Sequence, residues 1–349
     1  MPATDFRIAL IGYGYAGKTF HAPLINATPG LTLVAVGSSQ QASVQADLGD
    51  AIDVSADYQA VIQRADIDLV VIASPNDSHA PLAELALQAG KHVVVDKPFA
   101  LSLEQAQKLT ALAQQKQLLL SVFHNRRFDA DFIALKQLLA SKVLGGIAHL
   151  ESRFDRFRPE VRQRWREQAG PGAGLWFDLG PHLLDQALLL FGLPKQLQAT
   201  LKQLRPGATT DDWFSVYLDY GHFGVTLGAS MLSAAPSPRF TLQCQQGSWQ
   251  KFGLDVQEDQ LKQGLTPLSK GWGQDPCAAR LYTADTVTEQ ILTPGCYQQY
   301  YSAIATALRG EGPNPVPAEQ ACDVMYLLQL AEQSAASGKA CLVAAANRV

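Results

Sequence analysis

The sequence lacks the features that mark secreted, metal-binding and membrane proteins. Its five cysteines are scattered and odd in number, with neither C-x-x-C nor Cys/His spacing, which predicts free thiols and no metal site. No apolar run is long enough to span a bilayer. Residues 1–5 lead directly into a predicted strand, so we expect no signal peptide. We therefore expect a cytoplasmic protein without a membrane partner.

Long blocks of like charge are also missing. The formal net charge is −4 and no long basic stripe is present, which indicates that nucleic acid is not a partner. Hydrophobic residues make up 47% and charged residues 17% of the chain, as is typical of a globular protein. A chain of 349 residues is long enough for two domains, each with its own core.

Three glycines near the start carry the first functional signal. The apolar run 8–11 enters a G-x-G-x-x-G turn that precedes a predicted helix, which is the setting of a dinucleotide-binding turn. Gly12 permits the tight turn, Gly14 lets the backbone approach a pyrophosphate, and Gly17 allows close packing of the helix. A purely structural turn is the alternative, which we disfavour because further βα units follow. The predicted cofactor contacts here are Gly12, Tyr13, Gly14, Tyr15, Ala16 and Gly17.

The end of the next predicted strand, 31–36, bears on which cofactor is bound. An Asp or Glu there would bind the ribose 2′-hydroxyl of NAD and repel a 2′-phosphate. The sequence has Ser38 and Ser39 instead, and the next acidic residue is Asp47. The two hydroxyls can donate to a phosphate, although no arginine accompanies them. We predict NADP as the cofactor, with NAD as the alternative.

Later strands of the first 123 residues end in further polar residues. Strands are predicted at 69–73, 92–95 and 118–123, and ligands of such sheets lie beyond the carboxyl ends of the strands. We therefore interpret residues 1–123 as an NAD(P)-binding Rossmann domain. The additional predicted cofactor contacts are Ser74, Pro75, Asn76, His79, Asp96, Lys97 and Asn125.

From about residue 129 the pattern changes to that of an α+β domain. Strands are predicted at 147–154, 213–220, 223–232, 239–244 and 247–252, and a last helix at 318–337. This fits an antiparallel sheet. We assign 124–349 to substrate binding and oligomerisation. Residues 154–166 are dense in arginine. This segment could be a solvated surface or one wall of a polar substrate site, and the sequence favours neither. If it is a substrate wall, Arg156 and Trp165 are the candidate contacts.

Asp178 and His182 form the next candidate pair. Pro181 suits the first position of a helix, which would put His182 in its first turn and Asp178 just before it. A carboxylate so placed can accept a hydrogen bond from the imidazole, fix its tautomer and favour its protonated form. A lone histidine is more often structural, so this pair carries weight only in combination with other motifs.

Together these motifs resemble the glucose–fructose oxidoreductase / inositol dehydrogenase / MocA family. The family usually has Glu before the Lys-Pro pair, where this sequence has Asp96. The similarity extends over both halves of the chain. It rests on the glycine turn, Pro75-Asn76 with His79, Gly90-Lys91-His92-Val93, Asp96-Lys97-Pro98, Asn125-Arg126-Arg127, and the Asp178 to Asp185 segment.

The resemblance implies a fold, a site and a reaction. The implied fold is an α/β Rossmann domain followed by an α+β domain with a large open, mainly antiparallel sheet that forms a homodimer or homotetramer. The implied catalytic residues are Lys97, Asp178 and His182, which would also contact the substrate. The most similar subgroup is that of NADP-dependent scyllo-inositol dehydrogenases, so the implied substrate is a polyol, cyclitol or sugar.

Hydride transfer requires a base for the hydroxyl proton. His182 is the first candidate, with Lys97 stabilising the negative charge that develops on the oxygen. Lys97 is the alternative proton carrier. A non-catalytic NAD(P)-binding sensor of the same fold is the alternative function, since it would keep the glycines but not need the acid/base residues.

Overall fold

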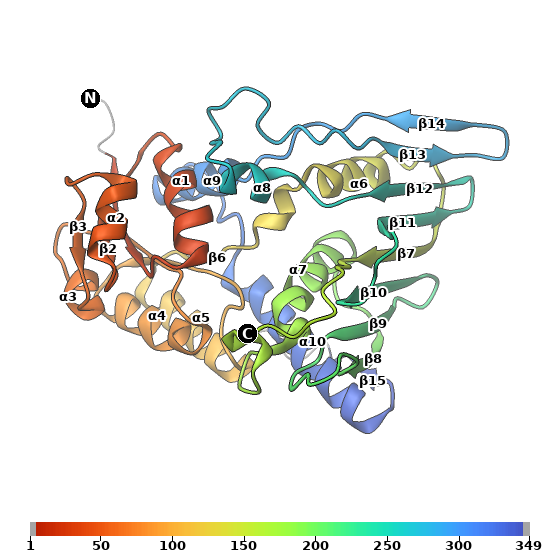
Figure 1. Cartoon of the computed structure of the whole chain (residues 1–349), viewed down its shortest axis with the longest axis horizontal. Helices are drawn as coiled ribbons and strands as arrows, with labels where there is room; N and C mark the ends of the chain where they lie inside the picture. Colours follow the sequence, from red (N-terminus) through yellow and green to blue (C-terminus); the bar gives the residue numbers. More distant parts are fainter. Residues whose placement is uncertain (1–4, 345–349) are drawn as a thin grey trace.

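The computed structural model describes residues 5–344, which are built around two β-sheets that lie side by side (Figure 1). Within these residues the first sheet has six parallel strands in the order β3-β2-β1-β4-β5-β6. This is the predicted Rossmann arrangement. The strands are β1 (Phe6–Ile11), β2 (Leu31–Gly37), β3 (Asp53–Ser55), β4 (Leu69–Ile72), β5 (His92–Val95) and β6 (Leu120–Val122).

The central strands are apolar because helices cover both faces of this sheet. All four residues of β4 are buried, as a strand in the middle of a parallel sheet requires. Ser102 caps α5 as a helix N-cap should, accepting a hydrogen bond from the Gln105 N–H. The helices are η1 (Gly17–His21), α1 (Ala22–Asn26), α2 (Gln41–Leu48), α3 (Tyr58–Ile62), α4 (His79–Gln88) and α5 (Leu103–Lys116).

The second sheet is larger and mainly antiparallel, as predicted. In the described part of the chain it has nine strands in the order β14-β13-β12-β11-β7-β10-β9-β8-β15, with β7 and β10 as a parallel pair. The strands are β7 (Ile147–Arg153), β8 (Gln196–Lys202), β9 (Trp213–Asp219), β10 (Gly224–Ser230), β11 (Pro238–Cys244), β12 (Gly247–Phe252), β13 (Ala279–Tyr282), β14 (Val287–Gln290) and β15 (Cys341–Leu342).

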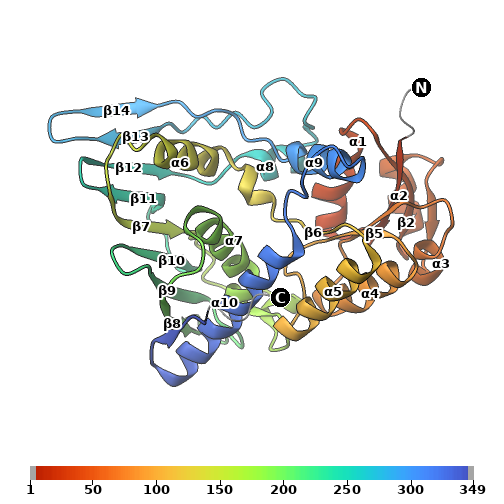
Figure 2. The same cartoon turned by 180° about the vertical axis from the view of Figure 1, so that it is seen from behind.

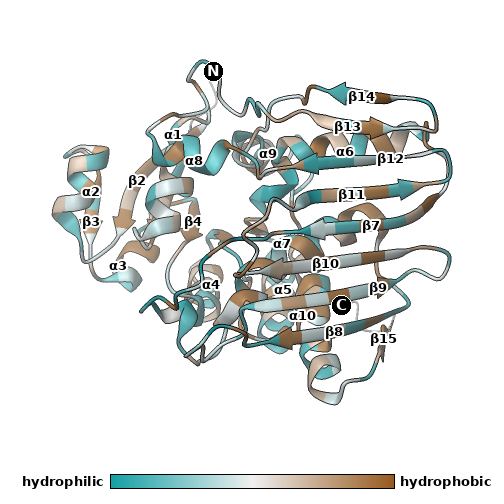
Figure 3. Cartoon of the chain, turned by 45° about the vertical axis from the view of Figure 1, so that its right-hand side comes forward, coloured by the Kyte–Doolittle hydropathy of each residue, from teal (hydrophilic) through white to brown (hydrophobic). Residues whose placement is uncertain are grey.

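Three helices lie on one face of this sheet, namely α6 (Ala130–Ser141), α7 (Gly174–Phe191) and α10 (Ala318–Ser337) (Figure 2). The strands alternate accordingly: in β9, Phe214, Val216 and Leu218 are buried and Tyr217 is exposed. Figure 3 shows the strands with mixed hydrophilic and hydrophobic segments, seen from the side that these helices do not cover. The core of the second domain therefore lies between the sheet and its helices.

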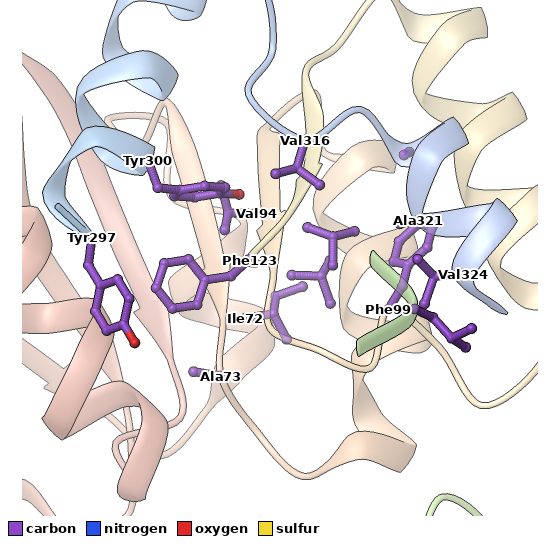
Figure 4. Packing of buried hydrophobic residues seen from close by; sticks show 14 of the residues in the cluster. Ile72, Ala73, Val94, Phe99, Phe123, Tyr297, Tyr300, Val316, Ala321 and Val324 are labelled. Carbon is purple, nitrogen blue, oxygen red and sulfur yellow. The ribbon is translucent and has the colours of Figure 1, made fainter. Parts of the chain in front are cut away.

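The chain returns to the first sheet near its C-terminal end. Helix α9 (Gln298–Leu308) places Tyr300 against Phe123, with ring centroids 5.0 Å apart, and Val316 lies close by (Figure 4). The Ser121 hydroxyl lies 2.8 Å from the Tyr300 hydroxyl and donates to the Val316 carbonyl at 3.0 Å. Helix α10 then packs on α5 as well as on α7. This buried seam holds the two sheets together.

Helix α7 begins earlier than the sequence predicts. It starts at Gly174, so Pro181 is inside the helix and His182 is in its middle, not in its first turn. The reason is a cap from a distant segment: Asp211 accepts hydrogen bonds from the N–H of Leu175 at 2.9 Å and of Trp176 at 2.6 Å. A cap that lies far away in sequence leaves no local signal.

The glycine turn after β1 has the predicted division of roles. Gly12 has a φ of +95°, a conformation that favours glycine, and a Cβ on it would lie 2.6 Å from the Ala73 carbonyl oxygen. A Cβ on Gly17 would lie 2.2 Å from the Gly12 carbonyl oxygen, so the helix packs directly on the turn. A Cβ on Gly14 would meet nothing within 4 Å. The backbone is therefore tightly packed at Gly12 and Gly17, whereas the space beside Gly14 is free of protein atoms.

The turn yields a test of stability. We expect Gly17→Ala to lower the free energy of unfolding by about 3 kcal/mol, because its methyl group overlaps backbone that cannot move without opening the turn. Gly14→Ala is the matched control and should change it by less than about 1 kcal/mol. Urea unfolding measures both variants. Equal losses in the two variants would contradict the packing described for Gly17.

Candidate active site

A cavity of about 450 Å³ lies where the carboxyl ends of the first sheet meet α7 and the segment that precedes it. Parallel α/β sheets bind ligands at this edge. Both halves of the chain contribute to its wall. The predicted site residues that line it are Tyr15, Ala16, Asp96, Lys97, Asn125, Arg156, Asp178 and His182.

The open side of the glycine turn fits the pyrophosphate of a dinucleotide. Gly14 leaves space beside the backbone, and Tyr15 and Ala16, which follow it, line the cavity. Tyr13 is buried, and its hydroxyl donates to Asp47 at 3.4 Å. Asp47 also pairs with Lys18 at 2.6 Å. The acidic residue nearest in sequence to the β2 end is thus already engaged by a cation.

Ser38 and Ser39 follow β2, and no carboxylate stands between them and Asp47. Ser38 is buried, and its Oγ accepts a hydrogen bond from the Gln40 N–H at 3.1 Å, which leaves the hydroxyl proton available. Ser39 is exposed. Their chemistry is compatible with a 2′-phosphate.

The loop after β4 is held by its own polar residues. The two ring nitrogens of His79 lie 2.8 Å from the Pro98 carbonyl and 2.9 Å from the Ser74 carbonyl, and the ring is buried. Asn76 donates to the Gly172 carbonyl of the second domain at 3.3 Å. These contacts fix the loops after β4 and β5. His79 therefore supports the backbone of both loops from inside the protein. The cofactor contacts of Ser74, Pro75, Asn76 and His79 stay predictions.

Lys97 and Asp178 join the two domains inside the cavity. The Lys97 ammonium donates to the Asp178 carbonyl oxygen at 2.7 Å and to its carboxylate at 3.2 Å. Burial lowers the pKa of Lys97, and the nearby Asp178 charge opposes that effect. For Asp178, burial alone would raise the pKa, but the positive charges of Lys97, Arg166 and Arg156 hold it below its usual value. Asp178 is therefore the shared anion of the site.

His182 lies one helical turn after Asp178 and also faces the cavity. The hydrogen bond predicted between them is wrong, because Asp178 is engaged by Lys97 and Arg156, and His182 Nδ1 has no hydrogen-bond partner among the described residues. The predicted protonated form is wrong too: burial, and then the Lys97 charge, lower the pKa of His182 well below its usual value. Both effects favour the neutral imidazole.

Several residues of the wall were not predicted. Helix α8 (Gln257–Lys262) brings Glu258, which accepts hydrogen bonds from Tyr15 at 2.6 Å and Arg126 at 2.8 Å. A helix of one or two turns leaves no periodicity to detect. Arg126 stands in the Asn125-Arg126-Arg127 motif, which was a usable signal. Trp165 begins the short turn η4 (Trp165–Glu167); its side chain lies outside the described part, so its substrate contact stays a prediction.

The described residues contain no cluster of three or more side chains suited to a metal ion. In the same residues, no helix has the length and apolar character needed to cross a membrane.

Comparison with known proteins matches both domains to one family. The model described as "Oxidoreductase family, NAD-binding Rossmann fold" matches residues 6–124. The model described as "Oxidoreductase family, C-terminal alpha/beta domain" matches residues 136–343.

Individual relatives match along almost the whole chain. The chain is 52% identical to the uncharacterized oxidoreductase YdgJ of Escherichia coli K12, covering 95% of this chain and 96% of the relative. It is 35% identical to the scyllo-inositol 2-dehydrogenase (NADP(+)) IolW of Bacillus subtilis, covering 94% and 93%. The solved structure of the YPO2259 protein of Yersinia pestis has a TM-score of 0.94 and 49% identity, covering 99% of both chains. The chain therefore belongs to the glucose–fructose oxidoreductase / inositol dehydrogenase / MocA family and is an NAD(P)-dependent oxidoreductase.

Proposed function

We propose that this enzyme interconverts a secondary alcohol and a ketone on a polyol, cyclitol or sugar, with NADP as its cofactor. The observation that carries the proposal is the convergence of Lys97, Asp178 and His182 on one cavity beside the glycine turn. The relative IolW, a scyllo-inositol 2-dehydrogenase that uses NADP, supports both the substrate class and the cofactor. A scyllo-inositol substrate is the narrowest form of the proposal.

Each polar group of the site has a distinct role. When bound, the cofactor accepts a hydride from the alcohol carbon or returns it to the ketone. Lys97 donates a hydrogen bond to the substrate oxygen and stabilises the negative charge that develops there. Asp178 holds the Lys97 ammonium in place. His182 is neutral and therefore able to accept the hydroxyl proton, which it gives back during reduction.

Lys97 is the second candidate for the proton carrier, because burial lowers its pKa toward the working range. Cofactor binding is assigned to the glycine turn, to Asn125 and Asp96 in the cavity wall, and to Ser38 and Ser39 for the 2′-phosphate. The amide of Asn125 suits the cofactor's polar ring substituent.

Association into a homodimer or homotetramer through the second sheet is part of the proposal. The face of the sheet away from α7 presents polar residues such as Tyr217, Thr226 and Gln250, and such a face can pair with a second copy through hydrogen bonds. A cytoplasmic location is also proposed, supported by five free cysteines.

Turnover separates this proposal from a cofactor-binding sensor. We expect absorbance at the reduced-cofactor band to rise when the protein and NADP are given at least one member of a panel of inositols and aldoses. Tight NADP binding, measured by calorimetry, without turnover of any alcohol or ketone in the panel would favour the sensor.

The acid/base roles predict a defined pattern of loss. We expect Lys97→Ala and His182→Ala each to lower kcat by about 100-fold or more, while the Kd for NADP changes by less than about threefold. His222→Ala, in an exposed loop, is the matched control and should keep full activity. A parallel loss of NADP affinity in the two site variants would assign these residues to cofactor binding instead.

The pH profile identifies the proton carrier. Because the pKa of His182 lies well below 6.5, its imidazole is the base form at neutral pH, and kcat/KM for oxidation should rise only on the acid side of pH 6.5 and be level above it. A rise confined to alkaline pH that disappears in Lys97→Ala would assign the proton to Lys97, whose pKa is lowered from 10.5.

Cofactor choice is tested at the end of β2. Ser38→Asp places a carboxylate where it repels a 2′-phosphate and accepts from a ribose hydroxyl, so the ratio of kcat/KM with NADP to that with NAD should fall by about tenfold or more. Ser43→Asp adds the same charge on an exposed position of α2 and should leave the ratio unchanged. An unchanged ratio in Ser38→Asp would show that this strand end does not read the phosphate.

A further inference from the structure

One wall of the cavity is formed by a segment rich in arginine. Residues 156–167, here named the arginine segment, lie between β7 and α7. Arg158, Arg162, Arg164 and Arg166 all line the cavity from it, together with Arg156. The reaction proposed above uses none of the first four. Their presence at the site needs its own explanation.

Buried contacts hold the arginine segment in a fixed course. Arg205 is almost completely buried, and its Nη1 donates to the carbonyls of Arg158 and Glu160, each at 3.1 Å. Its Nε bonds to Asp212 at 3.0 Å, and its Nη2 pairs with Glu167 at 3.0 Å. The backbone of the segment is thus anchored to the interior of the second domain.

Glu167 anchors the other end of the arginine segment. Its carboxylate accepts hydrogen bonds from the Arg162 N–H at 3.0 Å and from the Arg164 Nε at 2.7 Å. Glu167 is itself buried. The backbone of the arginine segment is therefore held by buried hydrogen bonds and ion pairs while its arginine side chains line the cavity.

The charges of the cavity wall do not balance. Eight basic side chains line it against three carboxylates. Six of the eight pair with acids: Lys97, Arg156 and Arg166 with Asp178, Arg126 and Lys262 with Glu258, and Arg164 with Glu167. Across residues 5–344, no hydrogen bond or ion pair engages the guanidinium of Arg158 or Arg162. Part of the excess positive charge of the wall is therefore carried by Arg158 and Arg162, the two cations without a carboxylate partner among these residues.

The unpaired cations also crowd one another. Burial, and then the charges of Arg162 and Arg164, lower the pKa of Arg158. Arg158 is partly buried and Arg162 is exposed. Like charges held close together are unfavourable unless an anion joins them. A guanidinium offers a planar fork of donors that matches a phosphate or a carboxylate. The wall is therefore complementary to an anionic ligand.

We propose that the substrate carries a phosphate or carboxylate group, which Arg158 and Arg162 bind. This inference rests on the proposed function and, within its class of polyols, cyclitols and sugars, favours members that carry an anionic group over neutral ones such as scyllo-inositol. The arginine segment precedes α7 of the second domain, whereas the groups assigned to the cofactor phosphates follow β1 and β2 of the first sheet. Because Tyr15 and Ala16 of the glycine turn line the same cavity, the ligands below are compared with NADP already bound.

Matched ligands test the proposal without depending on turnover. Calorimetry on the full-length protein with NADP compares glucose, glucose 6-phosphate and glucuronate, and compares myo-inositol with myo-inositol 1-phosphate. We expect at least one charged ligand to bind about tenfold or more tightly than its neutral partner, and its Kd to weaken as salt rises. The phosphate and carboxylate arms show which anion the wall prefers. If no charged ligand binds more tightly than its partner, the proposal is overturned.

Variants then assign the preference to the two arginines. Arg158→Gln and Arg162→Gln should each reduce the ratio of charged to neutral binding by about tenfold, with Arg162→Lys retaining part of it. Lys108→Gln, which removes one exposed positive charge on α5, is the control and should keep the ratio. An unchanged ratio in both arginine variants would overturn the assignment.

Turnover of the same ligands separates the two proposals. Suppose that charged ligands bind through Arg158 and Arg162 but are never oxidised or reduced. This result would contradict the proposed function and would still support the anion site. Turnover of neutral polyols with no preference for their charged partners would keep the proposed function and overturn the anion site.

Discussion

The contact between Lys97 and Asp178 is the interaction on which the site depends. Lys97 follows β5 of the first sheet and Asp178 lies in α7 of the second domain, so this pair connects the cofactor side to the substrate side. Both side chains are mostly buried, and each would be a costly unpaired charge without the other. The ammonium is thereby held at the cavity, where the proposed function requires it to meet a substrate oxygen. Asp178 also attracts Arg156 and Arg166, which draws the arginine-rich wall toward the same place.

The parts of the fold that local chemistry determines could be predicted from the sequence. The Gly12, Gly14 and Gly17 spacing after an apolar run predicts a tight turn on which a helix packs, and the structure confirms the close packing at Gly12 and Gly17 and the space at Gly14. Apolar runs predicted β1, β2, β4, β5 and β6 of the first sheet, and alternation predicted β7 of the second. Local chemistry also sets two helix ends: Ser102 is the N-cap of α5, and Gly338, with a positive φ, is the C-cap of α10.

What could not be predicted depends on contacts between distant residues. The cap that starts α7 comes from Asp211, so Pro181 was misread as a helix start. Burial and the nearby Lys97 charge lower the pKa of His182, and Asp178 pairs with Lys97 instead of with His182; both follow from how the two domains meet. Likewise, Arg158 and Arg162 lack carboxylate partners because the nearby carboxylates pair with the other basic residues of the wall. The composition of the chain does not specify these pairings.

We expect Lys97 and Asp178 to act in catalysis as one unit. A double-mutant cycle tests it most directly: kcat/KM is measured for Lys97→Met, Asp178→Asn and the double variant with the best substrate of the panel. If the pair is a unit, the double variant loses about as much activity as the worse single variant, because the second change removes nothing further. Losses that multiply across the two sites would contradict the account, since they would mean that each residue contributes independently.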